Sequence, residues 1–228
     1  MSTSDPSPRH FINTYQPLVL TAAGRRSAVA FSIPPFVDGS IRREPDLEHP
    51  LPSITCLCRG DKFAPRLRVG DTVAYFAVKA RYGPATMRHR RLTAVLRVRE
   101  ILPSHPEAAR WYRALGLPLP NNCMVAETGP NPLDQSHRRH RFDKGLSDDR
   151  VLRRWDALYH VRARPNGAFV ACEPLFTDLS WAAPVVTDGH LVEAFGRVPA
   201  TRTPGPLPAA DFVALMTRLG VPVPPSAR

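Results

Sequence analysis

The sequence predicts an α+β protein, built as a small mixed β-barrel with peripheral helices. Several short apolar segments have the length of strands and are separated by Gly-Asp and proline-containing turns. Fewer segments carry the start and stop signals of helices. The 26 prolines among 228 residues favour long irregular connections over a helical bundle. A chain of 228 residues is long enough to bury one substantial core, and its hydrophobic content of 43% is ordinary for a globular protein.

The N-terminal part predicts little regular structure. Residues 1–26 are expected to form a flexible leader, within which "TYQPLVLTA" could add an edge strand. The segment "SAVAFSI" then predicts a short strand that ends at the Pro34-Pro35 pair. The next segment, "PPFVDGSIRREPDLEHPLP", is a long polar loop. Loops of this length often carry function.

Three strands are expected in the middle of the chain. "SITCLC" places Ile54, Cys56 and Cys58 on one face. "DTVAYFAVKA" is almost continuously apolar, which is typical of a strand buried on both faces. "RLTAVLRVREIL" alternates between apolar and partly cationic positions, so one face is core and the other is partly charged.

Three helices have marked ends. "SHPEAARWYRALG" begins at the N-cap Ser104, with Glu107 completing a capping box and Gly116 as the stop. "SDDRVLRRWDALYHVRA" begins at Ser147, and two acids in its first turn suit the helix dipole. "FVALMTRLG" closes with Gly220. Between the last two, "GAFVACEPLF" predicts a strand, and "WAAPVVTDGHLVEAFG" a strand or a short irregular segment.

These elements divide the chain into three parts. We expect a leader at 1–26, a barrel domain with helical additions at 27–200, and a C-terminal helix with a proline-rich tail at 201–228. The four cysteines do not form a disulfide framework in a chain of this size. No segment has the pattern of a signal peptide or the length of a membrane span. A cytoplasmic protein with reduced thiols and no membrane partner is expected.

The positive charge is concentrated in two blocks. The formal net charge is +11. Residues 59–99 carry eleven Lys or Arg and two Asp, a local balance of +9. Residues 138–164 carry nine basic and four acidic groups, a balance of +5. Such clustering favours binding to an anionic polymer through its phosphates. The excess of arginine over lysine also fits GC-rich, bacterial-type codon usage and is no argument by itself.

The segment "ITCLCRGDKFAPRLRVGDTVAYFAVK", followed by "RLTAVLRVREIL", resembles the PUA-like superfamily, which includes the ASCH and EVE domains. It is most similar to nucleotide modification associated domains. The matching residues are Cys58, Arg59, Ala64, Arg66, Gly70 and Asp71. The resemblance covers residues 28–125. It implies a barrel that binds nucleic acid, in some relatives by holding a modified or extruded base in a pocket, and it implies no reaction.

From charge and resemblance together we expect nucleic acid, DNA or RNA, as the partner, with modification or restriction enzymes as further partners. The expected phosphate-facing and stacking residues are Arg42, Arg59, Arg66, Arg68, Lys79, Arg81, Tyr82 and Arg97. Stacking on an aromatic ring bracketed by cations singles out Tyr82. The expected base pocket uses Phe36, Asp38, Ser40 and Asn122, since recognition needs polar groups beside a stacking surface. The alternative is that Asp38-Gly39 is only a turn and that Asn122 only caps a loop.

A nucleic-acid-modifying enzyme is the rival hypothesis. Common hydrolase, P-loop and dinucleotide-binding motifs are missing from the sequence. A metal-dependent nuclease site could use Asp38, Glu44 and Asp46, or the cluster of His137, His140 and Asp143. A self-compensating surface loop accounts more simply for the acidic group. A solvated loop, in which adjacent cations disfavour a bound metal, accounts for the histidine cluster. Neither a metal nor a cofactor is therefore expected, and the catalytic residues stay unassigned. A protein-interaction module with a basic surface fits the same charge.

Overall fold

The computed structural model describes residues 7–137, 143–165 and 167–221. A mixed sheet with the strand order β1-β3-β4-β5-β2 organises them, and the short β6 pairs with β4. Strands β1 and β3 run parallel, and the other pairs are antiparallel. The strands are β1 His10–Tyr15, β2 Ser53–Thr55, β3 Thr72–Ala77, β4 Arg90–Leu102, β5 Phe169–Thr177 and β6 Val185–Val186. With the helices described below, this confirms the α+β class.

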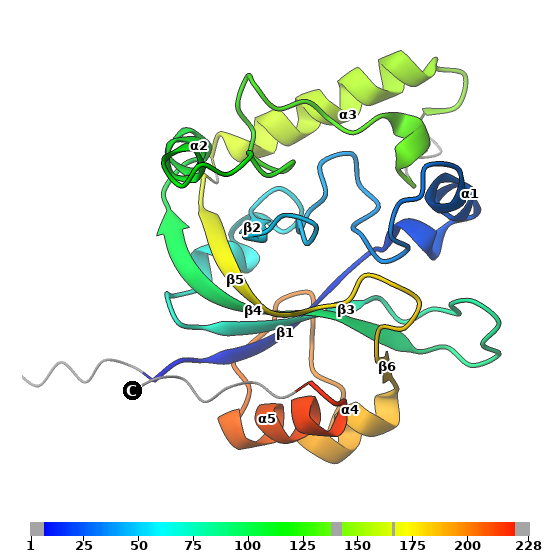
Figure 1. The fold of residues 1–228 in the computed structure, drawn as a ribbon, viewed down its shortest axis with the longest axis vertical. Helices are drawn as coiled ribbons and strands as arrows, with labels where there is room; N and C mark the ends of the chain where they lie inside the picture. The colour runs from blue at the N-terminus through cyan, green and yellow to red at the C-terminus, as the bar shows by residue number, and fades with distance from the viewer. Residues whose placement is uncertain (1–6, 138–142, 166, 222–228) are drawn as a thin grey trace, which may run out of the picture.

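The sheet curls into a half-barrel (Figure 1). Its longest strand, β4, has 13 residues and changes register against both of its neighbours. Two shifts interrupt its pairing with β5, and one interrupts its pairing with β3. Because each bulge bends a strand and increases its twist, β4 and β5 turn out of the plane of the other strands. The curl gives the sheet a concave side.

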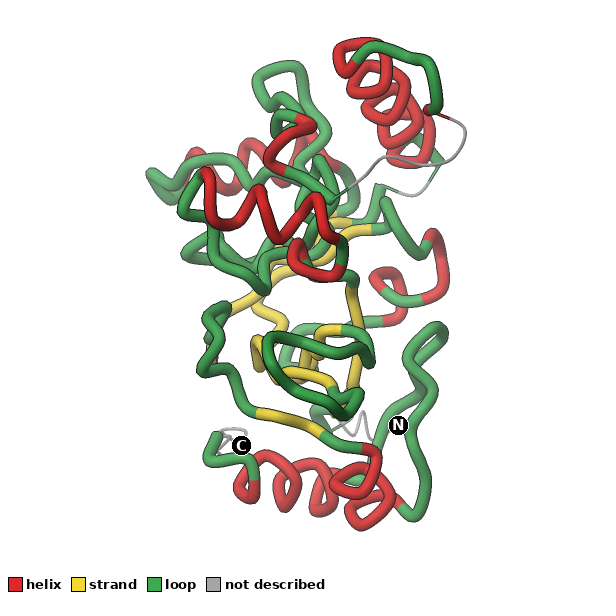
Figure 2. Tube along the Cα trace, turned by 90° about the vertical axis from the view of Figure 1, so that its right-hand side faces the viewer, coloured by secondary structure: helices red, strands yellow, loops and turns green. Residues whose placement is uncertain are grey.

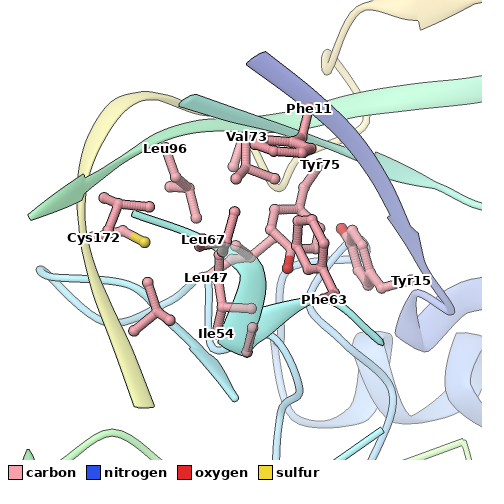
Figure 3. Close-up of a cluster of buried hydrophobic side chains, with 14 of the residues drawn as sticks. Phe11, Tyr15, Leu47, Ile54, Phe63, Leu67, Val73, Tyr75, Leu96 and Cys172 are labelled. Atoms are coloured by element: carbon pink, nitrogen blue, oxygen red, sulfur yellow. The ribbon is translucent and has the colours of Figure 1, made fainter. Parts of the chain in front are cut away.

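Each side of the sheet has its own hydrophobic cluster. Along β1, Phe11 and Tyr15 belong to the cluster on the concave side, whereas Ile12 belongs to the cluster on the other side. The period of two in a strand produces this division. The concave cluster also contains Val73 and Tyr75 of β3 (Figure 3).

The helices cover the sheet from both sides (Figures 1 and 2). The pair α4 and α5 packs on the convex face through Leu191, Phe212 and Met216. On the other side, α2 packs against β5, and α3 packs over the loop that follows α1. Their bounds are α1 Ala22–Ala30, α2 His105–Ala114, α3 Asp148–Ala163, α4 Asp188–Phe195 and α5 Ala209–Arg218.

The helix boundaries read from capping residues are confirmed. The Ser104 hydroxyl accepts the Glu107 N–H at 3.3 Å, which is the bond of an N-cap, and it donates to the Glu107 carboxylate at 3.0 Å. The Ser147 hydroxyl accepts the Arg150 N–H at the start of α3. Gly116 and Gly220, expected as stops, have φ values of +68° and +73°. These positive angles favour glycine over residues with a Cβ atom.

The N-terminal expectations were wrong in two places. Within the expected flexible leader, β1 pairs over its whole length with β3 and is largely buried. The segment "SAVAFSI" contributes its first four residues to α1, which starts at the N-cap Thr21. Val29, which had been expected in a strand, is 84% exposed. Alternation of small residues does not distinguish a strand from a short helix.

A third difference concerns residues 185–195. Beyond the two residues of β6, this segment forms the helix α4. Thr187 is its N-cap and accepts the His190 N–H at 3.2 Å, and Gly196 ends it with a φ of +67°. Both signals are present in "TDGHLVEAFG".

The division of the chain into domains stays a prediction.

The loop at residues 34–52 is irregular, as expected, but most of it is buried. It lies on the concave side, between the sheet and α3 (Figure 1). Asp38 holds its first turn, because one carboxylate oxygen accepts the backbone N–H groups of Ser40 and Glu44. In the described part of the chain, no helix combines the length and hydropathy that crossing a membrane requires.

Candidate functional site

A cavity of about 310 Å³ opens on the concave side of the sheet, and we call it the concave cavity. It lies between the end of β1, the loop at 34–52, β2 and the turns that follow β2. Its lining residues fall into three groups: aromatic walls, a buried polar interior and cations at the mouth. The aromatic walls are Tyr15, Phe63 and Tyr75. The buried polar interior consists of Asn13, Asp38, Glu44 and Thr55. The cations at the mouth are Arg59, Lys62 and Arg202.

The aromatic walls come from two strands and a turn. Tyr15 and Tyr75 stand edge to face, with their ring centroids 6.2 Å apart. Figure 3 shows the Phe63 ring beside these two tyrosines. The Tyr15 hydroxyl donates to the Phe36 carbonyl, which ties β1 to the loop. Phe63 also packs edge to face on Phe11, so the walls are fixed by the core behind them.

Asn13 is a polar residue at a core-facing position of β1. It lies between Phe11 and Tyr15 in the alternation of that strand and is 2% exposed. Its register partner on β3 is Tyr75, and its amide nitrogen donates to the Tyr75 hydroxyl at 3.4 Å. Its own carbonyl oxygen accepts the Thr14 N–H at 2.8 Å. An amide and a hydroxyl therefore line the cavity side by side.

Glu44 supplies a buried carboxyl group. One oxygen accepts the Thr55 N–H at 2.9 Å, and the other accepts the Thr55 hydroxyl and the Asn122 amide. Burial raises the pKa of Glu44 to about 7, although these hydrogen bonds oppose the increase. The group therefore changes charge near neutral pH.

The mouth of the cavity carries three cations, which differ in what they can do. The Arg59 guanidinium donates to the carbonyls of Thr14, Thr201 and Arg202, the last at 3.0 Å. Arg59 therefore fastens the connection between α4 and α5 to the end of β1. Lys62 and Arg202 are exposed. Within the described ranges their side chains form no hydrogen bond or ion pair, so they are available to an anion.

Two expected nucleic-acid contacts need correction. Arg42 is fully buried, donates to Asp156 at 2.6 Å and to the Asn121 carbonyl, and cannot reach an external phosphate. Tyr82 is 2% exposed and donates to the Val78 carbonyl at 2.5 Å. Its ring packs against Phe36 and His89, so no base can stack on it. Both side chains serve the fold.

The other expected contacts lie nearer to solvent. Arg66, Arg68 and Arg81 are exposed, and Arg97 is half-buried on β4. Lys79 forms an ion pair with Asp188, a residue that Arg90 also contacts at 2.6 Å. Lys79 is thus partly neutralised. The Arg59 guanidinium donates to three backbone carbonyls, so it is engaged within the protein.

Of the four expected pocket residues, only Asp38 lines the concave cavity. Phe36 is buried beside Tyr82, and Ser40 is bonded to Asp38. Asn122 accepts the Ser53 hydroxyl at 2.6 Å and donates to Glu44, so it supports the cavity from behind. Sequence reasoning missed several lining residues: Asn13, Tyr15, Thr55, Lys62, Phe63 and Arg202. Asn13 left a signal as a polar residue in an apolar alternation, and Lys62 left one because it lies in the basic block at 59–99.

Of the two rival metal sites, the group of Asp38, Glu44 and Asp46 does not assemble in the described ranges, and the group of His137, His140 and Asp143 is only partly described. In the described ranges, no group of three His, Cys, Asp or Glu side chains is placed to hold a metal ion. Asp46 accepts backbone N–H groups of Glu48 and Asn121, so it braces its own loop. Asp143 is buried and accepts the Trp155 indole at 3.0 Å. His140 lies outside the described residues.

Comparison of the chain with protein-family models gives no match, and neither does comparison with curated proteins or with solved structures.

Proposed function

We propose that this protein binds nucleic acid and takes one unstacked base into the concave cavity. The observation that carries the proposal is the composition of the cavity, which has aromatic walls, buried polar groups and exposed cations at its mouth. We further propose that the half-barrel is of the PUA-like kind, that the base is a modified one, and that base-modification or restriction enzymes are functional partners.

The three groups match the three parts of a nucleotide. The rings of Tyr15, Phe63 and Tyr75 offer flat or edge contacts to a base. The interior polar groups can read the base edge. Lys62 and Arg202 at the mouth can meet the phosphates on either side of it. A volume of about 310 Å³ lies at the lower end of the range for small-molecule sites.

Such a cavity cannot read a base that remains inside a duplex. Its polar groups are buried, so the base has to leave the stack, at a cost of about a few kcal/mol for a paired base. The nucleic acid that binds is therefore single-stranded, or it is a duplex whose target base is weakly paired. Exposed cations in the segment 59–99, among them Arg66 and Arg68, add affinity that does not depend on the base.

The test measures the salt dependence of binding to a fluorescent single-stranded oligonucleotide. The variant Lys62→Gln/Arg202→Gln removes both exposed mouth cations. Because each lost phosphate contact lowers the slope of log K against log salt by about 0.7 for a single strand, the slope should fall by about 1.4. Affinity at low salt should fall about tenfold or more.

The control variant Arg26→Gln/Arg110→Gln removes the same charge from exposed positions on α1 and α2. If the mouth of the cavity is the phosphate site, this variant should keep the wild-type slope. Equal losses in the two variants would show that binding follows net charge alone. Wild-type behaviour of the Lys62/Arg202 variant would refute the assignment of the mouth.

A further inference from the structure

We propose that the concave cavity selects a base that presents an exocyclic amino group beside ring acceptors, as cytosine does, and rejects uracil. This inference rests on the proposed function, because it specifies which base the same cavity accepts. It follows from which hydrogen-bond donors and acceptors of Asn13, Glu44 and Tyr75 are already used within the protein.

Glu44 is the acceptor in this arrangement. From the residues that the structure describes, its Oε1 atom accepts one hydrogen bond, donated by the Thr55 N–H at 2.9 Å, whereas Oε2 accepts two, from Thr55 and Asn122. Since a carboxylate oxygen has two lone pairs, Oε1 keeps the capacity for a second donor. An ionised Glu44 has no hydrogen to give, so it favours an amino group and repels a carbonyl oxygen.

Asn13 and Tyr75 are the donors. The Asn13 oxygen accepts the Thr14 N–H, and its nitrogen gives one hydrogen to the Tyr75 hydroxyl over a long 3.4 Å. The second amide hydrogen has no acceptor within the described part of the chain. The Tyr75 hydroxyl accepts that bond, and among the described residues its own hydrogen has no acceptor. Two donors and the acceptor Glu44 thus line the same cavity.

Cytosine complements this set, and uracil conflicts with it. The amino group of cytosine can donate to Glu44 while its ring nitrogen and carbonyl accept from Tyr75 and Asn13. Uracil has a carbonyl where cytosine has the amino group, so an oxygen would face the carboxylate. A buried site built around a hydrogen bond discriminates strongly against a ligand that leaves it unmade.

The experiment compares short single strands that differ only in this group, oligo-deoxycytidine and oligo-deoxyuridine, together with their RNA equivalents. We expect the cytosine strand to bind about tenfold or more tightly, because one bond to a charged acceptor accounts for about that factor. Tyr75→Phe removes one donor and should weaken cytosine binding about threefold to tenfold. The control Tyr112→Phe removes a hydroxyl that donates to the Leu51 carbonyl outside the cavity, and it should bind like the wild type.

The preference should also rise with pH between about pH 6 and pH 8. Ionised Glu44 can only accept, whereas its protonated form can donate to uracil. Burial holds the pKa of Glu44 at about 7, within this range. The other titratable and charged groups that line the cavity are Asp38, Tyr15, Tyr75, Cys58, Arg59, Lys62 and Arg202. Burial raises the pKa of both tyrosines well above 10, so they keep their protons in this range.

The outcomes separate the two proposals. Failure of every strand to bind would overturn the proposed function and this inference with it. Equal binding of cytosine and uracil strands, with Tyr75→Phe unchanged, would overturn the inference and leave nucleic-acid binding standing. A loss in Tyr75→Phe at an unchanged melting temperature, together with a preference that grows with pH, would support it.

Discussion

The buried carboxyl group of Glu44 makes the stability of this protein depend on pH in an uncommon direction. Most paired carboxylates have a lowered pKa in the folded state, but burial raises the pKa of Glu44 from 4.5 to about 7. Between these values the folded protein binds more protons than the unfolded chain does. The free energy of unfolding therefore falls as the pH rises through this window.

The size of the effect follows from the two pKa values. A difference of one unit corresponds to about 1.36 kcal/mol, so a change from 4.5 to about 7 corresponds to about 3 kcal/mol. Glu44 is only 6% exposed, so solvent screens this contribution little. The full contribution of Glu44 to the free energy of unfolding is present below about pH 4.5, and it is lost as the pH rises above about 7.

The perturbation is Glu44→Gln, which keeps the shape of the side chain and removes its titration. Urea unfolding, followed by tryptophan fluorescence, gives the free energy of unfolding at several values between about pH 4 and pH 8. Asp46 and Glu48 also have a raised pKa because of burial, and their contributions are common to both proteins. The difference between the two proteins therefore isolates Glu44.

We expect the wild type to lose about 3 kcal/mol relative to Glu44→Gln from the acid to the alkaline end of the titration. At low pH the glutamine variant should be the less stable protein, since its amide places hydrogens against the donors of Thr55 and Asn122. Two parallel curves would show that Glu44 is ionised in both states at neutral pH. The reasoning about the buried carboxyl group, and the pH dependence of base selection, would then be refuted.

Two further predictions concern the supports of the cavity. Arg59→Met should destabilise the fold by about 1 to 2 kcal/mol and speed amide hydrogen exchange at residues 197–207, because its hydrogen bonds to the carbonyls of Thr201 and Arg202 are lost. Unchanged exchange at these residues would show that Arg59 does not hold this segment in place. Gly39→Ala should destabilise by more than about 1 kcal/mol, since its Cβ would lie 2.1 Å from the His137 ring. Gly129→Ala is the control, with no atom within 4 Å, and equal melting temperatures of the two variants would refute the packing argument.

The helix ends and most strands could be predicted from sequence because their signals are local. A capping serine acts on an N–H three residues away, as Ser104 does, and alternation along β4 is visible within a few residues. The same locality explains the errors. The apolar character of "SAVAFSI" fits a strand or a helix, and the choice came from the Thr21 cap and from packing outside the segment.

The tertiary structure alone decided the site. Charge density along the chain could not show that Arg42 is buried against Asp156 or that Lys79 is paired with Asp188, since these partners lie more than a hundred residues away. Nor could it show that Asn13 and Tyr75 are neighbours, because a parallel pairing of β1 with β3 joins residues 62 apart. The amino-acid sequence by itself determined an α+β fold and a concentration of positive charge. The curl of β4 and the buried loop determined which side chains meet in the concave cavity, since that meeting depends on contacts between segments far apart in the chain.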